Sequence, residues 1–250
     1  MADARALERA LAVDGALEDV EFSGAFAWPQ SLNDRRFIDC RFVDTVFGSI
    51  DLEGTVFSGC TFERASLRGA NLRESSFQTC VFFVDDAAAD FRYAELRDAR
   101  FVGCDLTTVT FERANAHGLS LLRCQAQGAD FSLLDVGLAI GRNNTRFAFE
   151  ASDCNLAYAD FTGVTLTGTT LRDCRLAHAV LHRVDLTEAD LSGSDLTNIE
   201  SNALTLVGAD LRGARFNNLD PRTVDLSGAR VSVEQALVLL DALGIVVEDA

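Results

Sequence analysis

Lysine is absent from this sequence, and proline, tryptophan and methionine are nearly absent. All 22 basic residues are arginine and stand against 38 acidic residues, which gives a net charge of −16. Proteins that bind nucleic acid or an anionic membrane surface need basic surface, so this charge argues against direct contact with either. Apolar residues make up 48% of the chain, too many for a disordered protein.

Long hydrophobic runs are also missing. No stretch approaches the roughly 18 consecutive apolar residues of a transmembrane helix. The first residues, MADARALERALAV, contain arginines and acids but no apolar core followed by a small-residue cleavage site, so they do not resemble a signal peptide. We therefore expect a cytoplasmic protein, with its seven cysteines reduced.

A large apolar residue returns at every fifth position over most of the chain. The runs extend over Phe37–Phe82, Phe91–Val136 and Leu156–Val231. Leucine or phenylalanine fills most of these central positions, and a small residue usually stands two positions earlier. A period of five is neither the 3.6 of an amphipathic helix nor the 2 of a flat strand, and it indicates a repeat protein.

This period predicts an all-β solenoid. Five residues form one side and one corner, and four sides close a coil of about 20 residues. The central residue and the small residue before it point inward, and the other three face solvent. Stacked coils pair their backbones at the interstrand spacing of about 4.8 Å. Because no coil can bury its core alone, each coil depends on its neighbours for stability.

The cysteines test this geometry. They are Cys40, Cys60, Cys80, Cys104, Cys124, Cys154 and Cys174. Each stands two residues before a central position, so all are predicted to point inward and to stack from coil to coil. A metal or redox site is the alternative, but the chain has no CxxC motif and no histidine at an inward position. We therefore interpret the cysteines as small buried apolar side chains.

We predict no catalytic, cofactor-binding or metal-binding residues. A filled β-helix offers no cleft in which polar groups could converge. His117, His178 and His182 all stand at outward positions. The chain contains neither a GxxxxGK[ST] phosphate loop nor an HExxH motif.

The repeat is interrupted twice, near 83–90 and near 137–150. Such segments are either plain loops or functional insertions, since loops on rigid scaffolds often carry function. The second contains two arginines in an otherwise acidic protein. The candidate interaction residues in the two segments are Asp85, Asp86, Gly141, Arg142, Asn143, Asn144 and Arg146.

Both ends depart from the five-residue period. Residues 1–16 predict a short helix that caps the first coil, and the repeats then run over 17–231. Residues 232–250 begin with a capping box, Ser232 to Gln235, which predicts a helix from Val233 to Leu243. Ile245, Val246 and Val247 predict a short strand.

The C-terminal segment is either an end cap or a dimer interface. It has more apolar surface than a cap needs, so we favour a homodimer. The predicted interface residues are Val233, Leu237, Leu240, Leu243, Ile245 and Val246.

The five-residue pattern resembles the pentapeptide-repeat family, whose fold is a right-handed quadrilateral β-helix. Several stretches resemble its topoisomerase-protecting branch, the Qnr quinolone-resistance proteins and their relatives MfpA and AlbG. These are Arg123–Phe131 before the second interruption, Asn155–Phe161 after it, and Leu219–Leu226 and Ala236–Val247 near the C-terminus. The first interruption is shorter here than in that branch.

The resemblance implies a partner. Members of this branch bind DNA gyrase and, in some cases, topoisomerase IV, as acidic rods of about the width of duplex DNA. It therefore implies a DNA mimic that protects gyrase from quinolones or from a natural gyrase poison. Outward acids such as Asp160, Asp185 and Asp190 would contribute to the acidic surface. The alternative is a repeat scaffold that has no topoisomerase partner.

Overall fold

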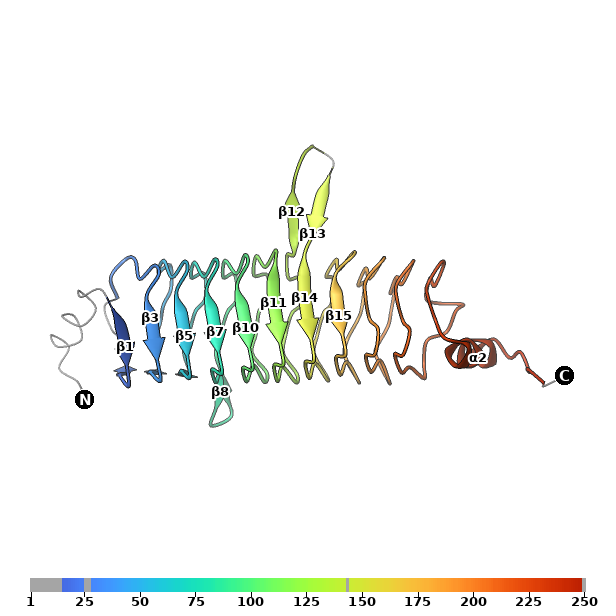
Figure 1. The fold of residues 1–250 in the computed structure, drawn as a ribbon, viewed down its shortest axis with the longest axis horizontal. Coiled ribbons are helices and arrows are strands. Elements are labelled where there is room, and N and C mark those ends of the chain that lie inside the picture. The colour runs from blue at the N-terminus through green and yellow to red at the C-terminus, as the bar shows by residue number, and fades with distance from the viewer. Residues whose placement is uncertain (1–14, 25–27, 143, 249–250) are drawn as a thin grey trace.

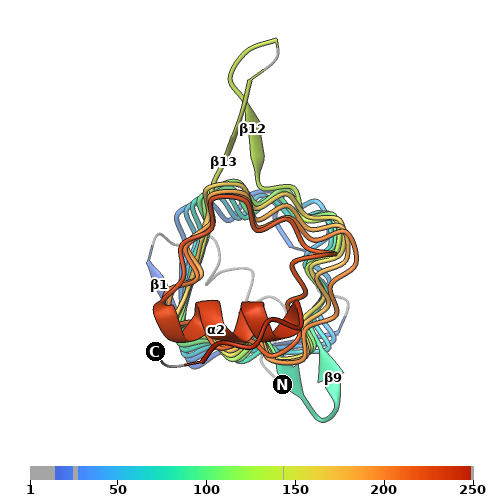
Figure 2. The ribbon, with the colours of Figure 1, turned by 90° about the vertical axis from the view of Figure 1, so that its right-hand side faces the viewer.

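The computed structural model describes residues 15–24, 28–142 and 144–248, and these form a straight rod of stacked coils (Figure 1). Seen along its axis, each coil has four sides (Figure 2). The predicted all-β solenoid with a right-handed quadrilateral cross-section is confirmed. The helix predicted over 1–16 lies outside the described residues except for Gly15 and Ala16, and Ala16 already belongs to the first strand.

The strands are short because each side of a coil holds only five residues. They are β1 (Ala16–Glu18), β2 (Glu21–Ser23), β3 (Arg36–Ile38), β4 (Arg41–Val43), β5 (Val56–Ser58), β6 (Thr61–Glu63), β7 (Ser76–Gln78), β8 (Phe83–Val84), β9 (Ala87–Ala88), β10 (Arg100–Val102), β11 (Leu119–Leu122), β12 (Gly137–Ala139), β13 (Thr145–Phe147), β14 (Phe149–Ser152) and β15 (Thr170–Arg172). The helix of the described region is α2 (Val233–Ala242).

We number the sides in chain order. The first side carries the eight-stranded parallel sheet β1-β3-β5-β7-β10-β11-β14-β15, and the second side carries β2-β4-β6. Single parallel bridges join coils on the third side, for example Asp90 to Thr110, and on the fourth side, for example Glu95 to Asn115. Parallel pairing follows directly from a coil that repeats itself every turn.

The register shows where the chain departs from the repeat. Residues 20 apart pair in most coils, as Arg36 does with Val56. Ser76 instead pairs with Arg100, and Ser120 with Glu150. The two interruptions thus add four and ten residues, and the ladder resumes in phase after each.

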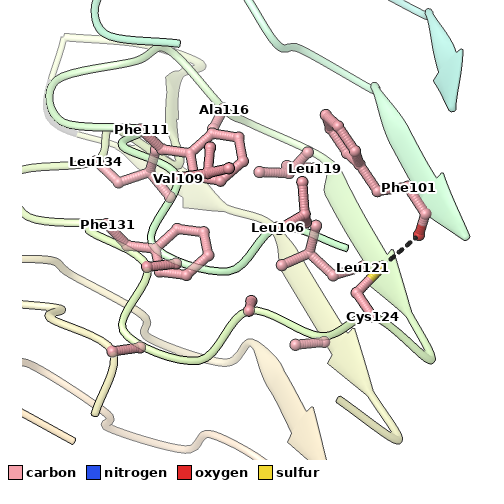
Figure 3. Close-up of a cluster of buried hydrophobic side chains, with 14 of the residues drawn as sticks. Phe101, Leu106, Val109, Phe111, Ala116, Leu119, Leu121, Cys124, Phe131 and Leu134 are labelled. Carbon is pink, nitrogen blue, oxygen red and sulfur yellow. Dashed lines mark hydrogen bonds between the residues drawn. The ribbon is translucent and has the colours of Figure 1, made fainter. Parts of the chain in front are cut away.

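The inward positions form a dry core that runs the length of the rod. Phenylalanine dominates the N-terminal coils, where rings of successive coils stack, as Phe57 does on Phe77 at a centroid distance of 4.9 Å. Leucine dominates the C-terminal coils. Figure 3 shows the transition around Phe101, Leu106 and Leu121, which are all fully buried.

All seven cysteines are buried. They lie in one column inside the core, at the corner between the first and second sides. The column continues across both insertions, since Cys104 Sγ lies 3.4 Å from Phe77 O and Cys154 Sγ lies 3.4 Å from Leu121 O. Each thiol donates in this way to a carbonyl of the preceding coil (Figure 3). The inward register of the cysteines is therefore observed along the whole described rod.

Most corners use a left-handed backbone. At these corners the residue two positions after the central one has a positive φ, and aspartate, asparagine and glycine tolerate this conformation best. Asp98 has φ 56° and its neighbour in the next coil, Gly118, has φ 77°. Gly118 must be glycine for a second reason, because a Cβ there would lie 2.2 Å from Oδ1 of Asp98.

Helix α2 covers the last coil. The predicted capping box is present: Ser232 N donates to Gln235 Oε1 at 2.7 Å, and Gln235 N donates to Ser232 Oγ at 3.3 Å. The same Gln235 side chain is buried and donates to the carbonyl oxygens of Leu211 at 2.6 Å and Ala214 at 2.5 Å. It thereby satisfies carbonyl groups that a following coil would otherwise pair.

The short strand predicted at Ile245–Val247 is wrong. These residues carry no strand assignment, and Ile245 N donates instead to Leu240 O at 3.0 Å, which completes the end of the helix. A strand needs a hydrogen-bonded neighbour, and no strand of the described residues pairs with this segment.

Candidate functional site

The most prominent projection is the hairpin of β12 and β13, which stands out from the corner between the fourth and first sides (Figures 1 and 2). Its strands are antiparallel, and Leu138 pairs with Arg146. Ile140 near the tip is 57% exposed, and Arg142 and Arg146 are exposed as well. The hairpin thus presents apolar and basic groups on an acidic rod.

The hairpin is shorter than the predicted interruption near 137–150. Phe149 and Glu150 already belong to β14 of the eight-stranded sheet. Of the predicted interaction residues, Gly141, Arg142 and Asn144 lie at the tip and Arg146 lies in β13, whereas Asn143 lies outside the described residues.

The root of this hairpin is tightly held. Gly118 N donates to Ala148 O at 2.8 Å, and Ala148 N donates to Val136 O at 3.1 Å. A Cβ on Gly137 would lie 3.0 Å from the Thr145 side chain, so a larger residue would push the two strands apart. The ring of His117, expected to be solvated, is half-buried against this root.

A second, smaller hairpin, β8–β9, leaves the corner between the second and third sides, opposite β12–β13 (Figure 2). Phe83 pairs with Ala88 and Val84 with Ala87, which leaves Asp85 and Asp86 as the two-residue turn. Their φ angles of 49° and 59° are those of a type I′ turn, the usual choice in two-residue hairpins. The two predicted residues therefore sit side by side at its tip.

The three acids singled out for the acidic surface do not lie on one face. Asp160 lies on the third side, Asp185 on the fourth and Asp190 on the first, as their bridges to Asp130, Thr165 and Thr170 show.

Each of these acids is half-buried and accepts the backbone N–H two residues later, at 2.7 Å for Asp160, 3.0 Å for Asp185 and 3.0 Å for Asp190. These carboxylates therefore stabilise the turn of the coil in addition to carrying negative charge. For Asp190, burial acts against ionisation, but hydrogen bonds from Ser192 and Arg172 outweigh it and lower the pKa.

Apolar side chains are exposed at the C-terminal end of the rod. Val233 is 76% exposed and Val246 is 82% exposed, and Leu237, Leu243 and Ile245 are also exposed. Leu240 is half-buried. Val238, which was not predicted, is 44% exposed and borders a hollow between α2 and the last coils that Ala214 and Phe216 also line. The prediction followed a single apolar stripe of the helix, Val233, Leu237, Leu240 and Leu243, and therefore missed Val238, which lies beside that stripe.

Among the residues that the structure describes, no group of three histidine, cysteine or acidic side chains is placed to hold a metal ion. The helix of the described region has 10 residues, fewer than a membrane crossing requires.

Comparison with known proteins shows which family has this architecture. The profile of "Pentapeptide repeats" matches residues 40–79, 87–107, 94–132, 151–173, 159–198 and 206–232. The chain is 30% identical over 122 residues to the quinolone resistance pentapeptide repeat protein QnrB96 of Scandinavium goeteborgense, covering 48% of this chain and 55% of that protein. It is 31% identical over 117 residues to the pentapeptide repeat protein QnrB4 of Escherichia coli, covering 46% and 52%.

These matches span about half the length of the curated relatives. The solved structure of full-length QnrB1, described as a plasmid-mediated fluoroquinolone resistance protein, extends the similarity along the rod. It superposes with a TM-score of 0.77 and 26% identity, over 92% of this chain and 100% of that one. With its coils, its profile match and its neighbours in agreement, this chain belongs to the pentapeptide-repeat family and is similar to the Qnr-like branch within it.

Proposed function

We propose that this protein binds DNA gyrase as a mimic of DNA and protects the enzyme from quinolones or from a natural gyrase poison. The observation that carries the proposal is the similarity along 92% of the chain to a structure described as a fluoroquinolone resistance protein. The chain is a rod with a net charge of −16, which suits a partner surface built to receive a polyanion. Topoisomerase IV is a second partner of the same kind.

The hairpin β12–β13 is the proposed point of specific contact. A uniformly acidic rod would be drawn to a basic groove but would gain little orientation from charge alone. Ile140, Arg142 and Arg146 are exposed and project beyond the four sides of the rod with the hairpin. Asp85 and Asp86 on the opposite corner offer a second, acidic contact.

We further propose that two copies associate through the C-terminal end. A solenoid cap needs to cover its last coil, and Gln235 and Leu239 do this from the inner face of α2. Val233, Leu237 and Val246 are left on the outer surface. Apolar area of this kind at the end of a rod fits a symmetric dimer. Such a dimer would double the length of acidic surface offered to gyrase.

The test is a gyrase supercoiling assay with and without ciprofloxacin. Wild-type protein should restore supercoiling in the presence of the drug, and at higher concentration should inhibit by competing with DNA. Deletion of the ten residues Leu138–Phe147 restores the 20-residue spacing, because it removes the insertion that separates Gln125 from Asn155. This variant should keep its β circular dichroism and lose most of the rescue.

To test the role of negative charge in gyrase binding, the substituted acids should be ones whose carboxylates do not stabilise the coils. Asp153, Asp173 and Glu188 are exposed corner residues, and replacing them with Asn, Asn and Gln keeps shape while removing three charges. This triple variant should bind gyrase more weakly at low salt and show a flatter salt dependence. Binding can be measured in the same way after substitution of Asp160, Asp185 and Asp190. Thermal melting is then measured as well, because these carboxylates also accept backbone hydrogen bonds within the coil. If no variant binds differently, or the wild type does not bind at low salt, the chain is better described as a scaffold without a topoisomerase partner.

A further inference from the structure

Both tyrosines of the chain stand at corners of the rod, in the left-handed backbone conformation. Tyr93 has φ 60° and is 44% exposed, and Tyr158 has φ 61° and is 53% exposed. Bulky residues rarely adopt this conformation, because it costs free energy that a glycine at the same corner would not lose. Since neither ring fills the core, the packing of the coils does not account for them.

The two tyrosine corners have the same layout. Gly69 N donates to Arg92 O at 3.1 Å, and in the other corner Gly128 N donates to Ala157 O at 2.8 Å. Each tyrosine therefore comes directly after a residue that is bonded to a glycine of the preceding coil. A Cβ on Gly69 would meet no atom within 4 Å, and one on Gly128 would meet only the Thr108 methyl group, at 3.7 Å. The glycine thus leaves open space on the side of each ring that faces the preceding coil.

At Tyr93 the chain itself fills this space. The guanidinium carbon of Arg68, the residue before Gly69, lies 5.0 Å from the centroid of the Tyr93 ring. Arg113 of the following coil donates from Nη1 to the Tyr93 hydroxyl oxygen at 3.2 Å. Arginine suits the position beside the ring because its planar guanidinium stacks on aromatic faces and is attracted by their π electrons. The corner at Tyr93 is therefore an occupied guanidinium site.

Tyr158 presents the same kind of face without an arginine on it. His178 of the following coil stacks on one face of the ring, with the ring centroids 4.8 Å apart and the planes 3° apart. The other face points toward Gly128. The residue before this glycine is Gln127, and no guanidinium of the described residues lies over the Tyr158 ring.

The following coils hold the Tyr158 ring in place. Behind it, Nε2 of His178 lies 3.5 Å from Nδ2 of Asn198. The Asn198 side chain is fixed in turn by Asn217, whose Nδ2 donates to Asn198 Oδ1 at 2.8 Å. A ring that is already held in one orientation loses little entropy when a ligand stacks on it.

We propose that the open face of Tyr158 binds an arginine side chain of a partner protein. The surrounding charge favours a cation, since Asp130 and Asp160 follow the two corners by two residues and neither forms an ion pair among the described residues. A nucleobase would arrive with phosphate groups, which the net charge of −16 repels. The proposal rests on the corner at Tyr158 and does not depend on whether the partner is gyrase.

The experiment uses the two tyrosines as NMR reporters in full-length protein labelled with ¹³C-tyrosine. A Gly-Arg-Gly peptide, acetylated and amidated at its ends, should move the ring signals of Tyr158. It should leave those of Tyr93 in place, because Arg68 already covers that ring. The matching Gly-Lys-Gly peptide should bind about three-fold more weakly, because an ammonium group cannot stack as a planar group does.

Two variants that add the same charge separate stacking from general attraction. Gln127→Arg places a guanidinium before Gly128, as Arg68 stands before Gly69, and should weaken peptide binding about five-fold because the open face is then occupied. Gln78→Arg adds an arginine at an exposed position of the first side and should change binding less than about two-fold.

Tyr93→Leu is the control for loss of a ring. Leu133 has φ 56° at another corner, so leucine fits such a position. Tyr93→Leu should leave peptide binding unchanged, whereas Tyr158→Leu, followed through the arginine signals of the peptide, should abolish it. The proposal is overturned if the Tyr158 signals of the wild type do not move, if the lysine peptide binds as tightly as the arginine peptide, or if the two tyrosine variants behave alike. It is also overturned if Gln127→Arg weakens binding no more than Gln78→Arg, or if single-stranded oligothymidine moves the Tyr158 signals at a lower concentration than the arginine peptide.

Discussion

The Nδ1 atom of His117 lies 3.0 Å from the carbonyl oxygen of Val136, the last residue before hairpin β12–β13. A carbonyl oxygen can only accept, so Nδ1 carries the hydrogen. The same oxygen accepts the N–H of Ala148 at 3.1 Å, where the chain returns from the hairpin. His117 therefore holds the point where the hairpin leaves and rejoins the rod.

This contact predicts that His117→Ala loosens the hairpin without unfolding the rod. Loss of one half-buried hydrogen bond costs about 1 kcal/mol, which corresponds to roughly five-fold more frequent opening of the root. Trypsin cuts after arginine, and Arg142 and Arg146 lie in the hairpin, so limited proteolysis measures the effect. Cleavage there should accelerate by about five-fold. His178→Ala, on another corner, is the control, and equal cleavage of the two variants would contradict the role given to His117.

The cysteine column predicts slow thiol chemistry. All seven thiols are buried in the core, so a thiol reagent cannot reach them while the rod is folded. Native protein should react slowly with a thiol reagent, and denatured protein should react fast at all seven cysteines. Cys60→Ala should lower the free energy of unfolding by about 1 kcal/mol, as expected for a small cavity. Rapid labelling of the native rod would show that the column opens.

The exposed C-terminal residues predict a dimer. Light scattering should give about 54 kDa, twice the 27.0 kDa of one chain. Val233→Asp with Val246→Asp should return the mass to that of one chain without loss of folding, since both side chains are largely exposed. Val46→Asp changes a residue that is 62% exposed on the N-terminal coils and should leave the mass unchanged. A single-chain mass for the wild type at micromolar concentration would rule out this interface.

We expect Asp210 to account for part of the loss of folding stability at low pH. Its side chain is nearly buried, and hydrogen bonds from Arg212, with Arg230 nearby, lower its pKa to about 2. A lowered pKa in the folded state stabilises the protein above the ordinary aspartate value, and this stabilisation is lost as the pH falls from about 4 toward 2. Asp210→Asn should lower the free energy of unfolding at pH 7 by about 1 to 2 kcal/mol. It should also flatten the decline between pH 4 and pH 2 in urea titrations, and an unchanged decline would assign the effect to other acids.

Much of the fold could be predicted because one rule repeats. An inward residue every fifth position specifies the sides, the corners and the cysteine column, and nothing distant in sequence is needed to place them. The capping box at Ser232 was equally readable, because it depends on side chains three residues apart. The four-residue insertion could have been counted from the shift in phase of the repeat, whereas the ten-residue insertion is two whole periods long and leaves the phase unchanged.

The predicted C-terminal strand was wrong because a strand depends on a neighbouring strand that the sequence does not show. Ile245, Val246 and Val247 favour a strand by type, but after the left-handed Gly244 at φ 76° they pair with no strand of the described chain. By contrast, the five-residue step alone places Asp160, Asp185 and Asp190 on three different sides, because each step turns one corner.

The register that survives both insertions has a consequence for how such proteins diversify. Because the ladder closes again after four or ten added residues, a new hairpin can enter at a corner without repacking the core. Evolution can thus try new appendages one at a time on an unchanged rod, and most trials leave a folded protein. A laboratory library of grafted hairpins at the corners of this chain should inherit the same tolerance.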